Sequence, residues 1–152
     1  MLPIKKILCP TDFSEPSREA VKVAGELAAH FRAGLVLVHV VPALPALPND
    51  PNYVFNIPEY ERLLHKDAEE KMGRLAGAGA LEGTTARTIF SHGDAASEIV
   101  RIAEVENSDL IVIATRGTTG WQRLLFGSVA EKVVRLAGCP VLTIRNPLEN
   151  GA

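Results

Sequence analysis

The 152-residue sequence has no excess of basic residues, few aromatic residues and few cysteines, and each shortage excludes a class of protein. Sixteen Lys and Arg stand against eighteen Asp and Glu, so the chain has no positive charge to spare for a nucleic-acid backbone. Aromatic residues make up only 5%, too few to stack single-stranded bases. Its two cysteines, Cys9 and Cys139, have no CxxC spacing, which excludes a disulfide framework and a zinc ribbon. We expect no nucleic-acid partner and two reduced, buried thiols.

Long apolar runs are also missing. Lys5 and Lys6 are followed by only three apolar residues before Pro10, whereas a secretory signal needs roughly 7–15. The run 35–41 is short and carries His39, whereas a membrane span needs about 18 apolar residues. We therefore expect a cytoplasmic protein with no membrane partner.

What the sequence does contain is an alternation of short apolar runs and amphipathic stretches, within a composition that is 47% hydrophobic. Runs bounded by Gly or Pro predict strands over residues 4–9, 35–41, 86–91, 110–114 and 141–145. Amphipathic periodicity predicts helices over residues 14–32, 59–75, 94–106 and 127–136. Ser14 is the expected N-cap of the first helix, with Pro16 in its first turn.

The periodicity also predicts which helical residues face the core. The inward face of the first helix is Ala20, Val23, Ala24, Leu27, Ala28 and Phe31. The inward face of the second is Tyr60, Leu64, Ala68, Met72 and Leu75.

The alternation predicts the fold class. Strand and helix follow one another throughout, which implies right-handed crossovers. We expect a single doubly wound α/β domain with a five-stranded parallel sheet in the order 3-2-1-4-5 and helices on both faces. The domain is expected to span residues 1–147, with a short tail at 148–152. Ligands of such sheets bind at the carboxyl ends of the strands, so the loops after Cys9, Val41, Ser91 and Ala114 are candidates.

One connection is unusually rich in proline. Half of the ten prolines fall between Pro42 and Pro58. A connection of about sixteen residues exceeds the usual limit of about 12–15, so it is either a functional lid or a mobile insertion.

The segment after the fourth strand has the chemistry of a phosphate site. Glycines at 117, 120 and 127 would let backbone amides approach an anion, and a helix that starts near Ser128 would add free amides. Hydroxyls and arginines accompany them at Thr115, Thr118, Thr119, Arg116 and Arg123. The segment is not a Walker loop, because Gly-Lys-Ser/Thr occurs nowhere. The alternative is an ordinary turn with Ser128 as N-cap.

The whole chain resembles the universal stress protein family. The segments that carry the resemblance are IKKILCPTDFSEPSREAV, LVLVHVV, GDAASEIVRIAE and SDLIVIATRGTTGWQRLLFGSVAEKVVRLAGCPVLTIR. The nucleotide-binding branch of that family has a glycine, two residues, a second glycine, nine residues, and then Gly-Ser or Gly-Thr. Gly117 and Gly127-Ser128 fit this pattern, whereas Ala114 stands at the first glycine. A methyl group there is harmless if Ala114 ends the strand, and obstructive if the position needs a positive φ or a close phosphate.

The resemblance implies a set of nucleotide-binding residues. Pro10, Thr11, Asp12 and Ser14 would lie beside the adenosine, with Asp12 hydrogen-bonded to the ribose or the adenine edge. The main chain at Val40 and Val41 would contact the adenine. The phosphates would lie against Ala114, Thr115, Arg116, Gly117, Gly127, Ser128 and Val129. The implied ligand is ATP, or AMP or ADP, with Mg²⁺.

The same resemblance implies a homodimer that pairs through the last strand, Val141–Arg145. An apolar edge strand favours pairing with another chain, although a neighbour within the chain could cover it. His39 and His92 are expected to be hydrogen-bonded histidines near the crevice rather than metal ligands. We predict no metal site in the protein and no catalytic residue.

Three functions remain open from the sequence. The first is a nucleotide-binding stress-response or signalling module that acts as a dimer. The second is a dimeric interaction protein of the same fold that binds no nucleotide, for which Ala114 is the best support. The third is a weak ATPase, or a protein that phosphorylates itself at Ser128 or a nearby threonine.

Overall fold

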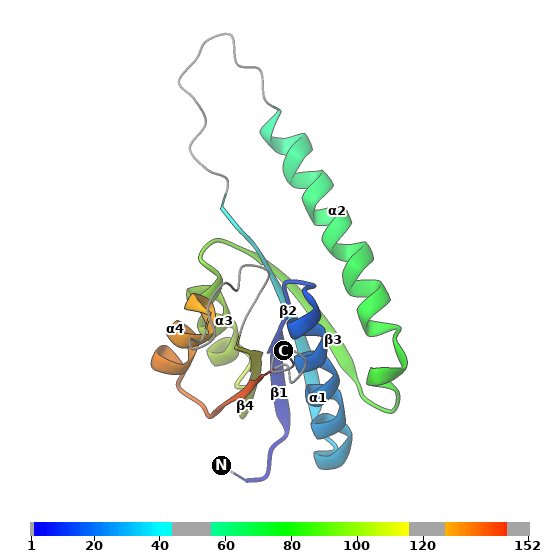
Figure 1. Cartoon of the computed structure of the whole chain (residues 1–152), viewed down its shortest axis with the longest axis vertical. Coiled ribbons are helices and arrows are strands. Elements are labelled where there is room, and N and C mark those ends of the chain that lie inside the picture. Colours follow the sequence, from blue (N-terminus) through cyan, green and yellow to red (C-terminus); the bar gives the residue numbers. More distant parts are fainter. Residues whose placement is uncertain (1, 44–55, 116–126, 146–152) are drawn as a thin grey trace, which may run out of the picture.

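A computed structural model of the chain describes residues 2–43, 56–115 and 127–145 (Figure 1). Five parallel strands form one sheet in the order β3-β2-β1-β4-β5, which confirms the predicted fold class and strand order. The strands are β1 (Lys6–Pro10), β2 (Gly34–Val41), β3 (Ala86–His92), β4 (Leu110–Ala114) and β5 (Val141–Ile144). The helices are α1 (Glu15–Phe31), α2 (Ile57–Ala76), α3 (Ala95–Val105) and α4 (Ser128–Leu136), with a short 3-10 turn, η1 (Gly79–Leu81).

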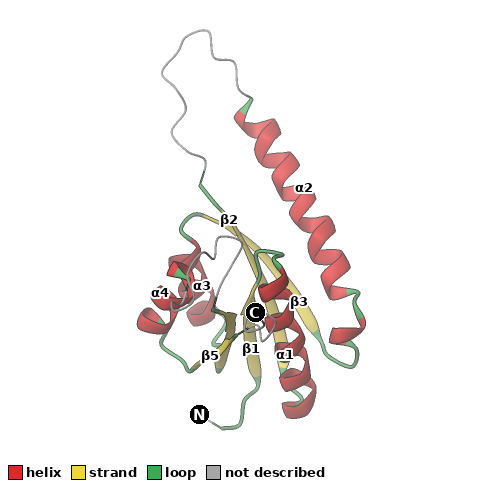
Figure 2. Cartoon of the chain, viewed as in Figure 1, coloured by secondary structure: helices red, strands yellow, loops and turns green. Residues whose placement is uncertain are grey.

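The helices cover both faces of the sheet (Figure 2). Alternate strand residues point to opposite faces. Ile7, Cys9, Leu35 and Leu37 pack on the side of α1, together with Met72 of α2. The residues that face the other side are Leu8, Val36, Val38, Ile111 and Ile113, and they pack against α3 and α4. Each face therefore has its own apolar layer, as the near-continuous hydrophobic runs of the strands require.

The start of α1 is determined locally. Ser14 is its N-cap and accepts a hydrogen bond from the Ser17 amide, as expected from the sequence, and Pro16 lies in the first turn. This cap fixes where the β1–α1 loop ends and the helix begins.

The first half of α2 departs from the prediction. The helix begins at Ile57, two residues earlier than expected, because Asn56 caps it and Pro58 suits its first turn. Figure 1 shows this half lying beyond the end of the sheet. Consequently Tyr60, predicted to face the core, is 38% exposed, whereas Ala68 and Met72 are buried as predicted.

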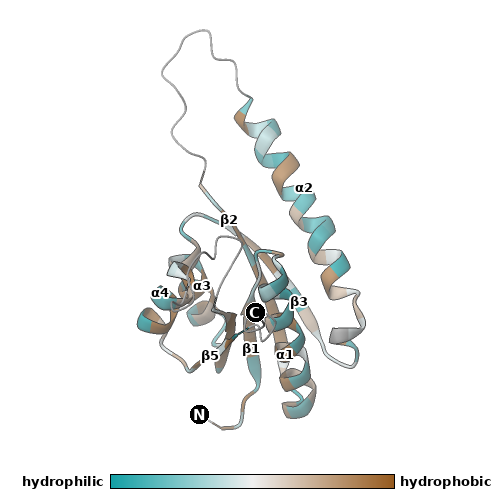
Figure 3. Ribbon diagram, viewed as in Figure 1, coloured by the Kyte–Doolittle hydropathy of each residue, from teal (hydrophilic) through white to brown (hydrophobic). Residues whose placement is uncertain are grey.

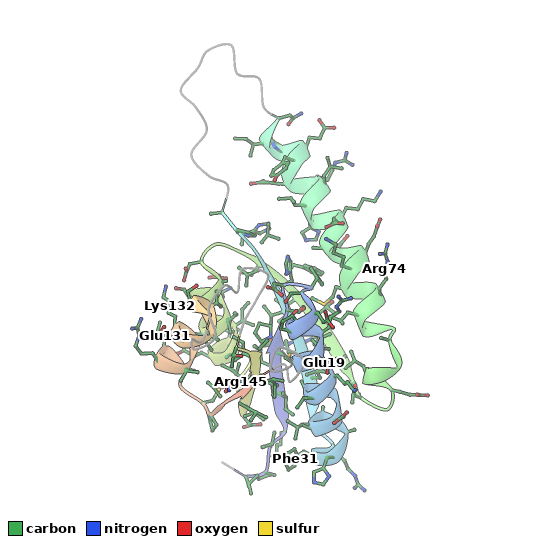
Figure 4. The ribbon with its side chains drawn as sticks, in the orientation of Figure 1. Glu19, Phe31, Arg74, Glu131, Lys132 and Arg145 are labelled. Carbon is green, nitrogen blue, oxygen red and sulfur yellow. The ribbon has the colours of Figure 1, made fainter. Side chains whose placement is uncertain are left out.

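Phe31 was also predicted to face the core and is 37% exposed (Figure 4). It is the last residue of α1 and packs edge-on against His30, with ring centroids 5.0 Å apart.

Polar and apolar residues otherwise separate along the helices (Figure 3). Among the described residues, none of the helices combines the length and the hydropathy that crossing a bilayer requires.

Candidate functional site

The carboxyl ends of β1, β2 and β4 border a cleft of about 210 Å³. It lies at the point where the strand order reverses, between β1 and β4, with the first residues of α3 and α4 on its rim. This is the position at which doubly wound sheets bind ligands. The residues that line it are Pro10, Thr11, Asp12, Ser17, Val38, Val40, Ala95, Ile99, Ile113, Ala114, Thr115, Gly127, Ser128, Val129 and Ala130.

Nine of the predicted site residues lie together in this cleft: Pro10, Thr11, Asp12, Val40, Ala114, Thr115, Gly127, Ser128 and Val129. Ser14 and Val41 do not line it. The Ser14 amide donates a hydrogen bond to the Asp12 carboxylate at 3.0 Å. The Val41 carbonyl accepts a hydrogen bond from the Gly93 amide at 3.1 Å. Arg116 and Gly117 lie outside the described residues, as do Thr118, Thr119, Gly120, Arg123 and most of the proline-rich connection.

The loop after β1 is held by a set of short polar contacts. The Thr11 amide donates to the Val38 carbonyl at 2.8 Å, which continues the β1–β2 ladder by one residue. The buried Thr11 hydroxyl lies 3.0 Å from the Ser17 hydroxyl and accepts from the Phe13 amide at 3.0 Å. These contacts leave the Asp12 side chain directed at the cleft.

Asp12 presents a carboxylate to the cleft. Partial desolvation raises its pKa, but the hydrogen bonds donated by the Ser14 hydroxyl and amide outweigh this, so the pKa lies below its ordinary value. Among the described lining residues, Asp12 is the one ionisable side chain. It is suited to accept hydrogen bonds from hydroxyl or amino groups of a ligand.

The start of α4 differs from the starts of the other long helices. Asn56, Ser14 and Asp94 cap α2, α1 and α3 through their side chains. Gly127 is the N-cap of α4 and supplies no side-chain hydrogen bond, and Ser128 is the first helical residue. The alternative in which Ser128 acts as the N-cap is therefore wrong.

The uncapped end of α4 is held beside the sheet by Thr115. The Gly127 amide donates to the Thr115 carbonyl, and the Thr115 amide donates to the Ile144 carbonyl at 2.9 Å. Because the first amides of a helix have no intrahelical acceptor, this end of α4 offers donors and a partial positive charge to the cleft. Phosphate groups bind readily at such ends.

Ala114 is the last residue of β4 and pairs with Ile144 of β5. It is not among the described residues with a positive φ, so the backbone here does not require glycine. Its methyl group is nearly buried and lines the cleft. This position therefore does not need glycine for its backbone conformation. Whether the methyl group obstructs a ligand depends on how closely the ligand approaches Ala114.

The cleft floor includes residues that the sequence did not single out: Ser17, Val38, Ala95, Ile99, Ile113 and Ala130. The positions of Val38 and Ile113 can be explained by the strands: Val38 pairs with Pro10, and Ile113 precedes Ala114 in β4. Ala95 and Ile99 come from α3; the sequence made the loop after Ser91, which leads into this helix, a candidate, but not the helix itself. They make the floor apolar, as the flat face of a base requires.

Of the two histidines near this edge, His39 is hydrogen-bonded as predicted. The ring Nδ1 of His39 lies 2.8 Å from the Thr11 carbonyl oxygen, and His92 is exposed. In the part of the chain that the structure describes, no three His, Cys, Asp or Glu side chains converge as metal ligands would. Near the rim, Lys132 (Figure 4) is paired with Asp94 at 2.8 Å.

Fold and cleft together define the class: a doubly wound α/β protein with a cleft at its switch point. The model of the universal stress protein family matches residues 3–145. The chain belongs to the universal stress protein family, as the resemblance of its sequence predicted.

Individual relatives agree with this assignment. The chain is 37% identical over 145 residues to universal stress protein MJ0531 of Methanocaldococcus jannaschii, covering 94% of this chain and 83% of the relative. The solved structure of MJ0577 from the same organism has a TM-score of 0.74 and 30% identity, covering 94% of this chain and 96% of that one. A universal stress protein from Archaeoglobus fulgidus, solved in complex with dAMP, shares the fold at a TM-score of 0.65 and 22% identity, covering 95% and 99%.

Proposed function

We propose that this universal stress protein binds an adenine nucleotide, ATP or else AMP or ADP, in the cleft at the β1–β4 switch point. The observation that carries the proposal is the uncapped start of α4, which faces the Asp12 carboxylate across an apolar floor. An apolar floor, one hydrogen-bond acceptor and a row of free amides match the base, the sugar and the phosphates of a nucleotide.

Each part of the ligand has a suitable partner. The base would lie over Val38, Val40 and Ile99, and the sugar hydroxyls would donate to Asp12. The phosphates would lie beside Thr115 and Gly127 and accept hydrogen bonds from the amides of Ser128 and Val129 and from the Ser128 hydroxyl. The involvement of Val41, Arg116 and Gly117 stays a prediction from the sequence.

Two further observations support an adenine nucleotide. Gly117 and Gly127-Ser128 keep the spacing of the nucleotide-binding branch of the family, and the Archaeoglobus protein of the same fold was solved with dAMP. The backbone at Ala114 removes one objection, because the departure from glycine costs no backbone strain there.

Mg²⁺ would accompany ATP through the phosphates rather than occupy a cage of protein ligands. Asp12 is the one carboxylate among the described lining residues, and Mg²⁺ at nucleotide sites is commonly held by one or two carboxylates, water and phosphate oxygens. The residues present fit a metal that arrives with its nucleotide.

We propose that nucleotide binding changes the shape or the association of the protein and that the nucleotide is not hydrolysed. The Asp12 carboxylate is engaged by Ser14 and has a lowered pKa, which makes it a weak general base. We propose no catalytic residue, and we keep the cytoplasmic location expected from the sequence as part of this proposal.

The proposal includes a homodimer that pairs through Val141–Arg145. β5 is an edge strand with β4 on one side. Leu142 is 38% exposed on it, and Val134 and Leu136 of the neighbouring α4 expose apolar side chains as well. Such an edge favours pairing with a second copy.

The alternative of a dimeric interaction protein without nucleotide rests on one observation. The Ala114 methyl group lines the cleft where the family motif has glycine, and a phosphate that needs close approach to the backbone would meet it. Calorimetric titration of the purified protein with ATP and with AMP separates the two. We expect saturable binding of one nucleotide per chain. If neither ATP nor AMP gives a binding signal at millimolar concentration, the interaction protein without nucleotide is the function that stands.

A further inference from the structure

His39 lies behind the loop that follows β1. The register of β1 and β2 ends at Pro10 and Val38, and His39 is the next residue of β2. Its ring Nδ1 lies 2.8 Å from the Thr11 carbonyl oxygen. A carbonyl oxygen only accepts, so Nδ1 is the donor. The His39 ring thus continues the attachment of this loop to β2 where the backbone ladder stops.

The same ring packs against Phe13. The centroids of the Phe13 and His39 rings are 4.5 Å apart with an interplanar angle of 36°, and the Lys71 ammonium lies 5.8 Å from the Phe13 ring centroid. Phe13 has a φ of 66°, a left-handed conformation that a bulky residue rarely adopts. Such a conformation persists where surrounding contacts hold it. The His39 ring is one of those contacts.

Asp12 is the residue between these two contacts. Thr11 before it is held through its carbonyl and Phe13 after it through its ring, both by His39. Asp12 lines the cleft, whereas His39 does not. A side chain outside the cleft therefore contacts the chain on both sides of the one ionisable group among the described lining residues.

We propose that His39 is a positioning residue for nucleotide recognition: it fixes the Asp12 carboxylate toward the ligand by holding Thr11 and Phe13. This inference rests on the proposed nucleotide function. It assigns to His39 no contact with the ligand. Its effect does not involve the α4 end of the cleft, which is attached separately through Thr115.

Two substitutions of similar polarity isolate the hydrogen bond. In His39→Asn the side-chain amide takes the place of Nδ1 and can still donate to the Thr11 carbonyl. In His39→Gln the amide reaches the place of Nε2 instead. Both variants lose the ring against Phe13, so a difference between them reports the hydrogen bond to Thr11.

The binding test is a double-mutant cycle with Asp12→Asn, read by calorimetry with ATP. With Asp12 present, we expect His39→Gln to bind ATP roughly tenfold more weakly than His39→Asn, the effect of about one hydrogen bond. In the Asp12→Asn background the two should agree within about twofold, because the group they position is gone. The same tenfold gap in both backgrounds, or no gap in either, would overturn the role of His39.

A measurement without nucleotide separates this inference from the proposed function. Carbon-detected NMR titration gives the pKa of Asp12 in the wild-type protein and in both variants. We expect it to rise toward its ordinary value in His39→Gln and to stay low in His39→Asn, since the Ser14 hydrogen bonds depend on the loop geometry. If the wild-type protein binds no ATP and this difference is present, the proposed function fails and the positioning of Asp12 stands. An unchanged Asp12 pKa in both variants rejects the positioning itself.

Discussion

At the scale of single residues, the carboxylates around the cleft are fixed by hydrogen bonds rather than by burial. Asp12 accepts from Ser14, Asp94 accepts from Ser97 and Lys132, and Glu98 accepts from Arg101 and Ser91. In each case the hydrogen bonds favour the charged form, so the pKa lies below its ordinary value. Each such group stabilises the fold above its unfolded pKa and loses that contribution as the pH falls toward its folded pKa.

Glu98 gives the clearest pH dependence. Hydrogen bonds from Arg101 and then from Ser91 lower its pKa from 4.5 to about 2. The contribution of Glu98 is thus complete above about pH 4.5 and lost between there and about pH 2. We predict that Glu98→Gln lowers the free energy of unfolding at pH 7 by less than about 1 kcal/mol, as is usual near the surface. The difference from wild type should close as the pH falls through this range.

Urea unfolding at several pH values between 7 and 2 measures this effect. Glu104→Gln removes the same charge from an exposed position on the same helix and is the matched control, for which a smaller change is expected. A Glu98→Gln deficit that stays constant down to pH 2 would contradict the assignment.

At the scale of elements, α2 consists of a packed half and an exposed half. Ala68 and Met72 are buried against the sheet, whereas Ile57, Tyr60 and Leu63 are exposed. In Figure 3 the half of α2 that extends past the sheet carries apolar residues, coloured brown, among hydrophilic ones. Periodicity alone made the whole helix amphipathic and therefore inward-facing, because it registers the spacing of apolar residues and not how far the neighbouring sheet extends.

The two halves of α2 should differ in their effect on stability. Met72→Ala leaves a cavity in the layer under α1 and should cost about 2–5 kcal/mol of the free energy of unfolding. Leu63→Ala, on the same helix at a position 54% exposed, should cost less than about 0.5 kcal/mol. Chemical denaturation of both variants compares them directly. Similar losses would show that the first half of α2 is packed after all.

At the scale of the whole molecule, the strand order explains why residues far apart in the chain meet. The reversal between β1 and β4 brings Asp12 and Gly127 to one cleft and leaves β3 and β5 as the two edges. The parallel sheet and the alternation of faces could be predicted, because apolar runs and amphipathic stretches alternate without interruption. The contribution of Ala95 and Ile99 could not, since it depends on how α3 packs against β2 and α4 rather than on any local pattern.

The ends of the helices and strands also show which features can be predicted from local sequence and which cannot. Ser14 was predictable as a cap because a serine stands before a proline and an apolar periodicity. Ser128 was not, because whether it or Gly127 caps α4 depends on the hydrogen bond from the Gly127 amide to Thr115, formed across the cleft. The positive φ of Phe13 likewise follows from contacts with β2 and α2 that no local pattern contains.

The two edges of the sheet should differ in association. A charge in the proposed dimer strand, Leu142→Asp, should convert a dimer to a monomer by placing like charges at the pairing edge. Thr88→Asp introduces the same charge at an exposed position of the opposite edge strand, β3, and should leave the dimer intact. Light scattering after gel filtration gives the mass of each. A monomeric wild-type protein would rule out the dimer, and loss of the dimer with Thr88→Asp alone would place the interface on β3.

We propose above all that the cleft beside the start of α4 holds the phosphates of an adenine nucleotide. The most direct measurement is calorimetric titration of ATP into Gly127→Glu and Gly138→Glu. Gly127 has a φ of −55°, so glutamate fits the backbone there but brings a negative charge to the phosphate position. Gly138 is exposed, with nothing within 4 Å of an added Cβ. We expect Gly127→Glu to weaken ATP binding at least roughly tenfold, because its carboxylate would repel the phosphates, and Gly138→Glu to bind ATP like the wild-type protein. Equal affinity of the two variants for ATP would contradict this proposal.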